Sequence, residues 1–384
     1  MAIDPANANP PTNQLSFQNI INEFGENSTK SLGGYRMNNL NVGGFTELPL
    51  DGDTCGILAN GSIPVDNQEI KFSDFYNSRL NVLVDCYTSN QNRVNAKTKY
   101  TAGSQPGNYR IIGPKGGDNS NSSESPPSNT SGKKITITVN KSIGSQSSSN
   151  TSTVALRTGT WTTGTDLRIN VRSSGFISGA GGNGGNGGYN ASGGYSGTSG
   201  NSAIGVDYTG GTTKIVGVSG AKIQRGYGGG GGGGDSKGRT ENGGKPWLYG
   251  QGSGGGGGAG IPGGVGGYEP APDGYPRADG NDGFAGGTLL AGGGGAAGGH
   301  IGHGKEGGYI GGGAGGRGAD SEQTAQIGNN GEAGGGEWQE GPSNYGGGAI
   351  GGNGYAIVKK SSSTVDTSGF SGTLNGGTTT SNPI

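Results

Sequence analysis

The sequence predicts a mainly irregular and β fold, in which a polyglycine-II helix bundle is joined to a small β domain and a short helical N-terminal region. Of its 384 residues, 94 are glycine, and 73 of these lie in residues 175–354. Hydrophobic residues make up only 27% of the chain, which is too few for one ordinary core throughout. Before the glycine-rich part, apolar and polar residues alternate with the period of two that is typical of strands.

The N-terminal region, residues 1–80, contains two short apolar elements. The first is a predicted helix that begins after the N-cap Ser16 and ends before Gly25, because its apolar residues recur at the helical spacing i, i+3, i+4, i+7. These residues are Phe17, Ile20, Ile21 and Phe24. The second element, 70–76, carries Phe72, Phe75 and Tyr76. Helices this short are unstable alone in water, so both apolar faces must pack on each other or on a neighbouring chain.

The second region, residues 81–174, is predicted to be a small antiparallel sheet or sandwich of half-buried strands. Its strand candidates are 81–85, 109–112, 135–139 and 167–171. Residues 118–131 contain no apolar side chain, which predicts a mobile loop. The last region, 358–384, is rich in serine, threonine and glycine and is expected to be a flexible tail.

The third region, residues 175–357, consists of glycine bursts separated by chemically mixed segments. A flexible linker is one interpretation of such a composition. Against it, the bursts interrupt segments that carry isoleucine, valine, tyrosine and tryptophan, and several bursts have similar lengths of about eight to ten residues, which would span about 25–31 Å as polyglycine II. Collagen is excluded because the period of three is not sustained, and glycine disfavours strands. Packed polyglycine-II helices remain, with period-three side chains such as asparagine at the outer edge.

Charge and hydropathy exclude several classes of partner. The formal net charge is −1, which does not favour nucleic-acid binding. No apolar run is long enough to insert into a membrane. The first residues have neither a basic nor an apolar signal region, so we expect no signal peptide. Whether Cys55 and Cys86 form a pair is left open.

No constellation predicts catalysis, a cofactor or a metal, so we expect a protein that is not an enzyme. The only histidines, His300 and His303, lie in one glycine-rich stretch, and two exposed polar residues are the simpler interpretation. Residues 279–283 hint at a calcium loop but lack the EF-hand spacing. Matches to GxGxxG carry no information at this glycine content.

The alternation of pure glycine runs with variable segments, together with the run Ser174–Gly188, resembles the glycine-rich domain of T-even phage tail-fibre adhesins. The resemblance implies a polyglycine-II sandwich whose loops bind the host surface. Three segments, 16–25, 31–35 and 70–76, are similar to modules of marine cyanophage virion structural proteins. This second resemblance implies that residues 1–80 attach the chain to the virion. The candidate attachment residues are Phe17, Ile20, Ile21, Phe24, Phe72, Phe75 and Tyr76. The chain would then be made in the host cytoplasm and reside in the virion tail.

The aromatic residues between the bursts are expected to lie in loops and are the candidate receptor-binding residues, because tyrosine and tryptophan give rigid contact area with a polar group. They are Tyr189, Tyr195, Trp247, Tyr249, Tyr268, Tyr275, Tyr309, Trp338 and Tyr345. The alternative is that these rings only cover the bundle. Expected partners are other phage tail or fibre proteins and a host polysaccharide or outer-membrane protein; a homo-oligomer is left open. A purely structural virion protein and a glycine-rich antifreeze-like protein are the other two functional hypotheses.

Overall fold

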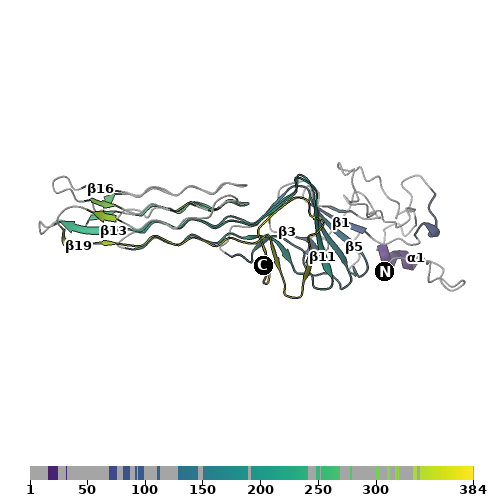
Figure 1. Cartoon of the computed structure of the whole chain (residues 1–384). Coiled ribbons are helices and arrows are strands. Elements are labelled where there is room, and N and C mark those ends of the chain that lie inside the picture. Colours follow the sequence, from purple (N-terminus) through teal and green to yellow (C-terminus); the bar gives the residue numbers. More distant parts are fainter. Residues whose placement is uncertain are drawn as a thin grey trace.

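The computed structural model describes part of the chain in detail. The described residues are 16–24, 32, 69–75, 81–86, 91–92, 94–98, 110–112, 129–145, 150–188, 192–240, 248–250, 252–268, 277–278, 300–302, 309–311, 316–317, 319, 332–334 and 338–383. Figure 1 shows an elongated molecule in which a unit built of strands carries several long extended segments, and short strands lie at the far end of these segments. Among the described residues, no helix is long and apolar enough to span a bilayer.

The strand unit has three sheets whose strands pair almost entirely in parallel. The first face has the order β21-β11-β8-β5-β1-β4, the second β2-β6-β9-β12-β22, and the third β23-β20-β10-β7-β3. The strands of the first face are β1 (Asn81–Cys86), β4 (Arg110–Ile112), β5 (Lys134–Val139), β8 (Asp166–Val171), β11 (Thr212–Gly217) and β21 (Thr364–Asp366). Those of the second are β2 (Gln91–Asn92), β6 (Ser142–Gly144), β9 (Phe176–Ser178), β12 (Lys222–Gln224) and β22 (Thr373–Asn375). Those of the third are β3 (Val94–Asn95), β7 (Val154–Arg157), β10 (Ser202–Val206), β20 (Ile357–Lys359) and β23 (Thr378–Thr380).

The order of these strands along the chain makes the unit a three-sided parallel β-solenoid. The chain visits the first, second and third face in turn and then returns to the first, and each strand pairs in parallel with its equivalent in the next coil. Five coils are built in this way from residues 81–380. Since each coil stacks only on its neighbours, the coils share one continuous core. Strand β4 is the exception, because it pairs antiparallel with β1 at one edge.

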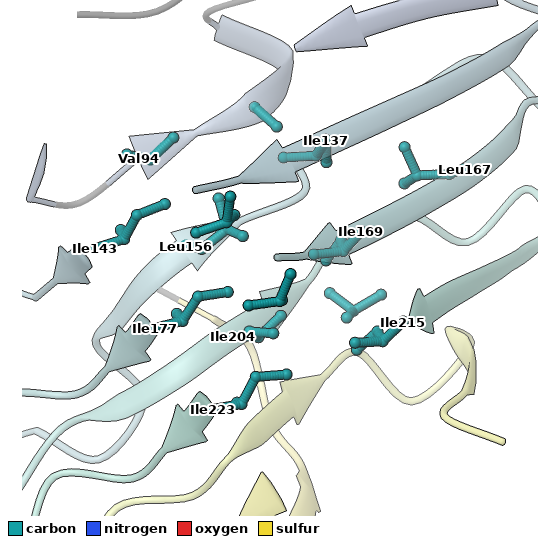
Figure 2. Close-up of a cluster of buried hydrophobic side chains, with 14 of the residues drawn as sticks. Val94, Ile137, Ile143, Leu156, Leu167, Ile169, Ile177, Ile204, Ile215 and Ile223 are labelled. Carbon is teal, nitrogen blue, oxygen red and sulfur yellow. The ribbon is translucent and has the colours of Figure 1, made fainter. Parts of the chain in front are cut away.

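The solenoid core consists of aliphatic ladders that follow from the strand register. On the second face, Ile143, Ile177 and Ile223 occupy equivalent positions in consecutive coils. On the third face, Leu156 pairs with Ile204, which pairs with Ile357. Figure 2 shows these ladders from different faces converging on one interior, together with Ile137, Ile169 and Ile215 of the first face.

Two expectations for the β domain are wrong. The predicted antiparallel arrangement is replaced by parallel faces, because each strand meets its equivalent one coil later and not the next strand in sequence. The predicted half-burial also fails for the middle strands. Thr136, Thr138 and Asn170 are as buried as the isoleucines beside them, which is the usual state of strands inside a parallel sheet.

The C-terminal residues also differ from their predicted role as a flexible tail. Within 358–384, strands β21, β22 and β23 form the fifth coil and pair with β11, β12 and β20. Their serine- and threonine-rich composition reflects exposure at the end of the solenoid, where one side of each strand has no neighbouring coil among the described residues. The boundary expected at residue 174 likewise lies inside the solenoid, since β9 to β12 follow it.

The predicted N-terminal helix is confirmed as α1 (Phe17–Phe24). The hydroxyl of Ser16 accepts a hydrogen bond from the amide of Asn19 at 3.2 Å, as expected for an N-cap. The second predicted element contains a single 3₁₀ turn, η2 (Phe72–Phe75).

Long insertions at one corner of the solenoid form the extended part of the molecule. The third coil is interrupted between β9 and β10 by residues 179–201, and the fourth between β12 and β20 by residues 225–356. The far end carries two small sheets that contact one another. Their strands are β13 (Ser236–Thr240), β14 (Leu248–Gly250), β15 (Arg277–Ala278), β16 (His300–Gly302), β17 (Tyr309–Gly311), β18 (Glu332–Gly334) and β19 (Trp338–Asn344).

Candidate interaction surface on the glycine-rich bundle

The insertions form a bundle of extended segments that run side by side from the corner of the solenoid (Figure 1). We number them 1 to 7 in chain order. Within the described residues they are 179–188, 192–201, 226–235, 252–260, 262–268, 316–317 with 319, and 345–355. Segments 2 and 5 do not stand out as glycine bursts in the sequence, because serine, threonine, valine and tyrosine interrupt their glycines.

Backbone hydrogen bonds join the segments with a period of three residues. In segment 1, one third of the amides, those of Gly181, Gly184 and Gly187, donate to carbonyls of segment 5. Another third, Gly182, Gly185 and Gly188, donates to segment 3 at 2.8 Å. The carbonyls of the remaining third, Ala180, Asn183 and Asn186, accept from segment 2. Segment 1 also accepts from segment 4, so it binds four neighbouring segments, and among the described residues these hydrogen bonds run between segments and not within one.

Segment 3 lies at the centre of the bundle. Its amides donate to segments 2 and 4, and its carbonyls accept from segments 1, 6 and 7. All seven consecutive glycines, Gly228–Gly234, are buried. Because the backbone of this segment is satisfied by five neighbours, its order requires no hydrophobic core.

The spacing between segments leaves no room for side chains at most bundle positions. A Cβ atom on Gly184 would lie 1.8 Å from the carbonyl oxygen of Gly255, and one on Gly351 would lie 1.9 Å from that of Thr198. By contrast, a Cβ atom on Gly352 would meet nothing closer than the Ser199 hydroxyl, at 3.3 Å. Glycine is thus required where a residue faces a neighbouring segment and is replaceable where it faces outward.

Two asparagines occupy the outward third of segment 1 and bind the segments on both sides. Asn186 accepts the amide of Tyr195 on its backbone oxygen at 2.9 Å and the amide of Tyr268 on its side-chain Oδ1 at 3.1 Å. Three residues earlier, Asn183 accepts the amides of Thr198 and Val265 in the same manner, at 2.8 and 3.1 Å. The expectation that period-three asparagines lie at the outer edge is confirmed for both.

The two tyrosines beside Asn186 are among the most exposed large side chains of the described residues. The exposed fraction is 57% for Tyr195 and 59% for Tyr268, and that of Val265 is 58%. Segments 1, 2 and 5 together form this flank, and apart from tyrosine they contain no ionisable side chain. The flank therefore combines exposed rings, carboxamides and hydroxyls on an uncharged backbone scaffold.

A cluster of charged side chains lies at a different corner of the solenoid. Arg157, the last residue of β7, donates two hydrogen bonds to the buried carboxylate of Asp207, at 2.8 and 3.0 Å. The side-chain hydrogen bond to Asp207 is the main cause that raises the pKa of the Arg157 guanidinium. Lys360 lies 4.0 Å from the same carboxylate. Arg157 ends β7, whereas Asp207 and Lys360 follow β10 and β20, so these charged groups connect three consecutive coils on the third face.

Ser145 is a junction residue that sequence reasoning missed. It is fully buried after β6, at the corner from which the bundle leaves. Its hydroxyl accepts the amide of Ala180 at 2.6 Å and the side-chain amide of Asn201 at 3.0 Å. Its backbone amide donates to the carbonyl of Ile261 at 3.0 Å. A serine among many serines carries no signal in the sequence, so only the structure identifies it as the residue that fixes the bundle to the solenoid.

The remaining candidate receptor-binding residues fall into two groups. Tyr249, Tyr309 and Trp338 lie in strands β14, β17 and β19 of the far-end sheets, and Tyr345 is half-buried at the start of segment 7. The register places both Tyr249 and Trp338 on strands that flank β13. Tyr189, Trp247 and Tyr275 lie outside the described residues.

The candidate attachment residues are distributed unevenly. Ile20 is fully buried and belongs to the same cluster as the solenoid core, and Phe17 packs against that cluster. Phe72 has an exposed fraction of 41%. Ile21, Phe24 and Phe75 lie within α1 and η2, whereas Tyr76 lies outside the described residues. A contact with a neighbouring chain through Ile20 would thus compete with its place in the core of this chain.

Other predicted features can be placed only in part. His300 lies in β16, and His303 is outside the described residues. Within the described residues, no group of three or more histidine, cysteine, aspartate or glutamate side chains is arranged to hold a metal ion. Cys86 ends β1, whereas Cys55 is outside the described residues.

No protein-family model matches this chain, and no curated protein matches it. Among solved structures, the chain is similar to the crystal structure of the gp37-gp38 adhesin tip complex of the bacteriophage S16 long tail fibre. The sequence identity is 16%, the TM-score is 0.32, and the similarity covers 82% of this chain and 88% of the other. Because the TM-score is below 0.5, the function proposed below rests on the geometry and sequence of the chain itself.

Proposed function

We propose that this chain is a bacteriophage tail-fibre or tail-tip adhesin, located in the virion tail, that binds the host cell surface without catalysing a reaction. The observation that carries the proposal is the bundle, which extends from one corner of the solenoid toward far-end sheets that carry Tyr249, Tyr309 and Trp338. A protein that holds aromatic residues at a distance from its anchored end suits recognition of a surface.

We further propose that the bundle segments are polyglycine-II helices. Three features support this assignment: the hydrogen bonds repeat every three residues, they run only between segments, and glycine is required at the inward positions. At a rise of about 3.1 Å per residue, the ten residues of segment 3 would span about 31 Å. Such a rod needs few apolar residues, which accounts for the composition.

In this proposal the solenoid and the N-terminal region connect the rod to other phage tail or fibre proteins. The exposed Phe72 and the residues outside the solenoid core are available for that contact. The host-side partner is a surface polysaccharide or an outer-membrane protein. The far-end aromatic residues are the candidate hot spots, since binding energy at interfaces concentrates in a few such side chains.

The test compares purified parent protein with Trp338→Ala and Tyr249→Ala variants in binding to cells of the strain that propagates the phage. We expect the parent to bind cells and to compete with phage adsorption. Loss of a hot-spot ring weakens binding by roughly thirtyfold, equivalent to about 2 kcal/mol. Melting curves confirm that each variant remains folded.

The result that contradicts the proposal is a folded parent protein that neither binds these cells nor slows adsorption of the phage. Together with its presence in purified particles, that result would establish the alternative, a purely structural virion protein.

A further inference from the structure

The flank around segment 1 retains hydrogen-bonding capacity that the fold does not use. The side-chain oxygens of Asn183 and Asn186 each accept a hydrogen bond from a backbone amide of segment 5. Within the described part of the chain, neither Nδ2 group has a hydrogen-bond acceptor, although each carries two donor hydrogens. Both residues are only half-buried, so these donors lie at the surface.

These donors repeat along the bundle with fixed neighbours. Asn183 and Asn186 are three residues apart on an extended segment, a separation of about 9 Å at 3.1 Å per residue. On one side of the asparagines lie Tyr195 and Thr198 of segment 2, and on the other lie Tyr268 and Val265 of segment 5. The flank is therefore a linear, repeating arrangement of amide donors bordered by exposed rings and a hydroxyl.

Its backbone is held in place before any ligand binds. The amide of Tyr195 is bound to segment 1 and its carbonyl to Gly232 of segment 3, at 2.9 Å each. The amide of Tyr268 is bound to Asn186 and its carbonyl to Gly187. Because both tyrosines are anchored in this way, binding would cost little conformational entropy beyond that of the rings.

The chemistry of the flank selects an uncharged ligand rich in hydroxyl groups. Segments 1, 2 and 5 have no lysine, arginine, histidine, aspartate or glutamate, so a phosphate or carboxylate would find no counter-charge there. Tyrosine rings offer flat apolar area with a polar tip, and carboxamides donate to hydroxyl oxygens. A straight row of repeated donors further favours a polymer of repeating units.

We propose that the flank formed by Asn183, Asn186, Tyr195 and Tyr268 binds a linear neutral polysaccharide that lies along the bundle. The inference rests on the proposed adhesin function for the source of this polysaccharide, which is the host envelope. It places recognition on the side of the rod, separate from the far-end aromatic residues.

The experiment measures binding of the full chain to four immobilised neutral probes: dextran, mannan, galactan and the neutral polysaccharide fraction of the host envelope. Heparin serves as the acidic comparison. We expect binding to at least one neutral probe and none to heparin. Raising the salt concentration should leave the affinity unchanged, since no charged group takes part.

Three variants separate ligand contact from folding. Asn186→Asp keeps an oxygen for the Tyr268 amide but removes the Nδ2 donor, and should lower the affinity about tenfold with an unchanged melting temperature. Replacing both Tyr195 and Tyr268 by alanine should lower the affinity for the polysaccharide by roughly thirtyfold or more. Tyr355→Ala is the matched control, because this ring is also exposed but belongs to segment 7, which has no hydrogen bond to segment 1 or 5 among the described residues.

Several outcomes would overturn the inference. One is a parent protein that binds none of the neutral probes, and another is a set of folded flank variants that bind like the parent. A third is a parent dimer, seen by light scattering, that the tyrosine variants convert to monomers, since a second copy would then occupy the flank. If the parent and the flank variants bind host cells equally well, while the far-end variants Trp338→Ala and Tyr249→Ala bind weakly, the inference fails and the adhesin proposal stands. If the parent binds a neutral polysaccharide through Tyr195 and Tyr268 but does not bind host cells, the adhesin proposal fails and the polysaccharide site on the flank stands.

Discussion

The solenoid and the glycine bundle are two regions of one chain that reach order by different means. In the solenoid, side chains such as Ile137, Ile169 and Ile215 fill a shared interior, and backbone pairing serves to stack the coils. In the bundle there is almost no side-chain interior, and the largest buried apolar cluster among its described residues consists of Tyr227, Ala259 and Ala319. Its segments are held mainly by hydrogen bonds between their backbones, to which side chains such as Asn183 and Asn186 add a few.

The comparison shows that burial of backbone and burial of apolar side chains are separable requirements for order. The solenoid tolerates polar residues such as Thr136 in buried positions because its aliphatic ladders supply the driving force. The bundle has no such reserve, so each buried glycine contributes through its hydrogen bonds and through the absence of a side chain. The two regions should therefore respond in opposite ways to a change in side-chain size.

Removing side-chain volume should have its largest effect in the solenoid. Ile169 is fully buried, and Ile169→Ala should lower the free energy of unfolding by about 2–5 kcal/mol, because it leaves a cavity between packed coils. Chemical denaturation followed by circular dichroism measures the change. The exposed Thr364→Ala is the control and should stay within about 0.5 kcal/mol of the parent. An Ile169 variant as stable as its parent would mean that the ladders do not support the solenoid.

Adding side-chain volume should destabilise the bundle, in a manner that depends on the residue within each three-residue repeat. Gly351→Ala directs a methyl group into the backbone of Thr198 and should cost about 1–3 kcal/mol. Gly352→Ala, one residue later, directs it toward solvent and the Ser199 hydroxyl, which accepts the Gly352 amide at 3.2 Å, and should change the free energy of unfolding by less than about 1 kcal/mol. Melting temperatures and hydrogen exchange in segments 3 and 7 distinguish the two.

The variants Gly351→Ala and Gly352→Ala serve as controls for each other. Both replace glycine by alanine in the same segment, so the change in backbone flexibility is the same for both. Equal effects for Gly351 and Gly352 would contradict the hydrogen-bonded bundle and favour a flexible glycine linker.

The smallest expected effect is a pH-dependent change in the melting temperature that arises from a carboxyl group of the solenoid. The amide and hydroxyl of Ser368 hold the pKa of the exposed Asp366 carboxyl below its ordinary value of 3.8. A carboxyl whose pKa is lowered by folding stabilises the folded state above its ordinary pKa, and this contribution is lost as the pH falls through the lowered pKa. Melting at about pH 5 and about pH 3 should show a slightly smaller acid loss for Asp366→Asn than for the parent. Segments 1, 2, 4, 5 and 7 contain no carboxyl side chain, so their exchange protection should not change through this cause.

The sequence allowed the strands to be predicted but not the way they pair. The alternation at Ile135 and Ile137 correctly marks a strand and its inward side chains. Parallel pairing between coils depends on contacts between distant residues. The equivalent strands β5, β8, β11 and β21 begin at residues 134, 166, 212 and 364, and the bundle insertions hide the repeat by making these intervals unequal.

The candidate flank was accessible from the sequence only in fragments. The spacing of Asn183 and Asn186 predicts outward side chains on a threefold segment, and the exposed tyrosines were expected to be binding residues. Their meeting at Asn186 could not be predicted, because Tyr195 and Tyr268 come from segments of opposite direction on either side of segment 1. Assignment of these tyrosines to loops was wrong, since both lie within extended bundle segments.

The position of the insertions has a consequence for synthesis of the chain on the ribosome. Strand β10 pairs with β20, β11 with β21 and β12 with β22, and all three of these partner strands follow the whole bundle in sequence. Until residues 357–375 emerge, the nascent solenoid has open strand edges, and exposed edges favour pairing with other chains. A premature stop within the bundle would therefore release a product with an incomplete rod and an unclosed solenoid, so shortened versions of this protein should be made by removing whole segment pairs internally and not by truncating its end.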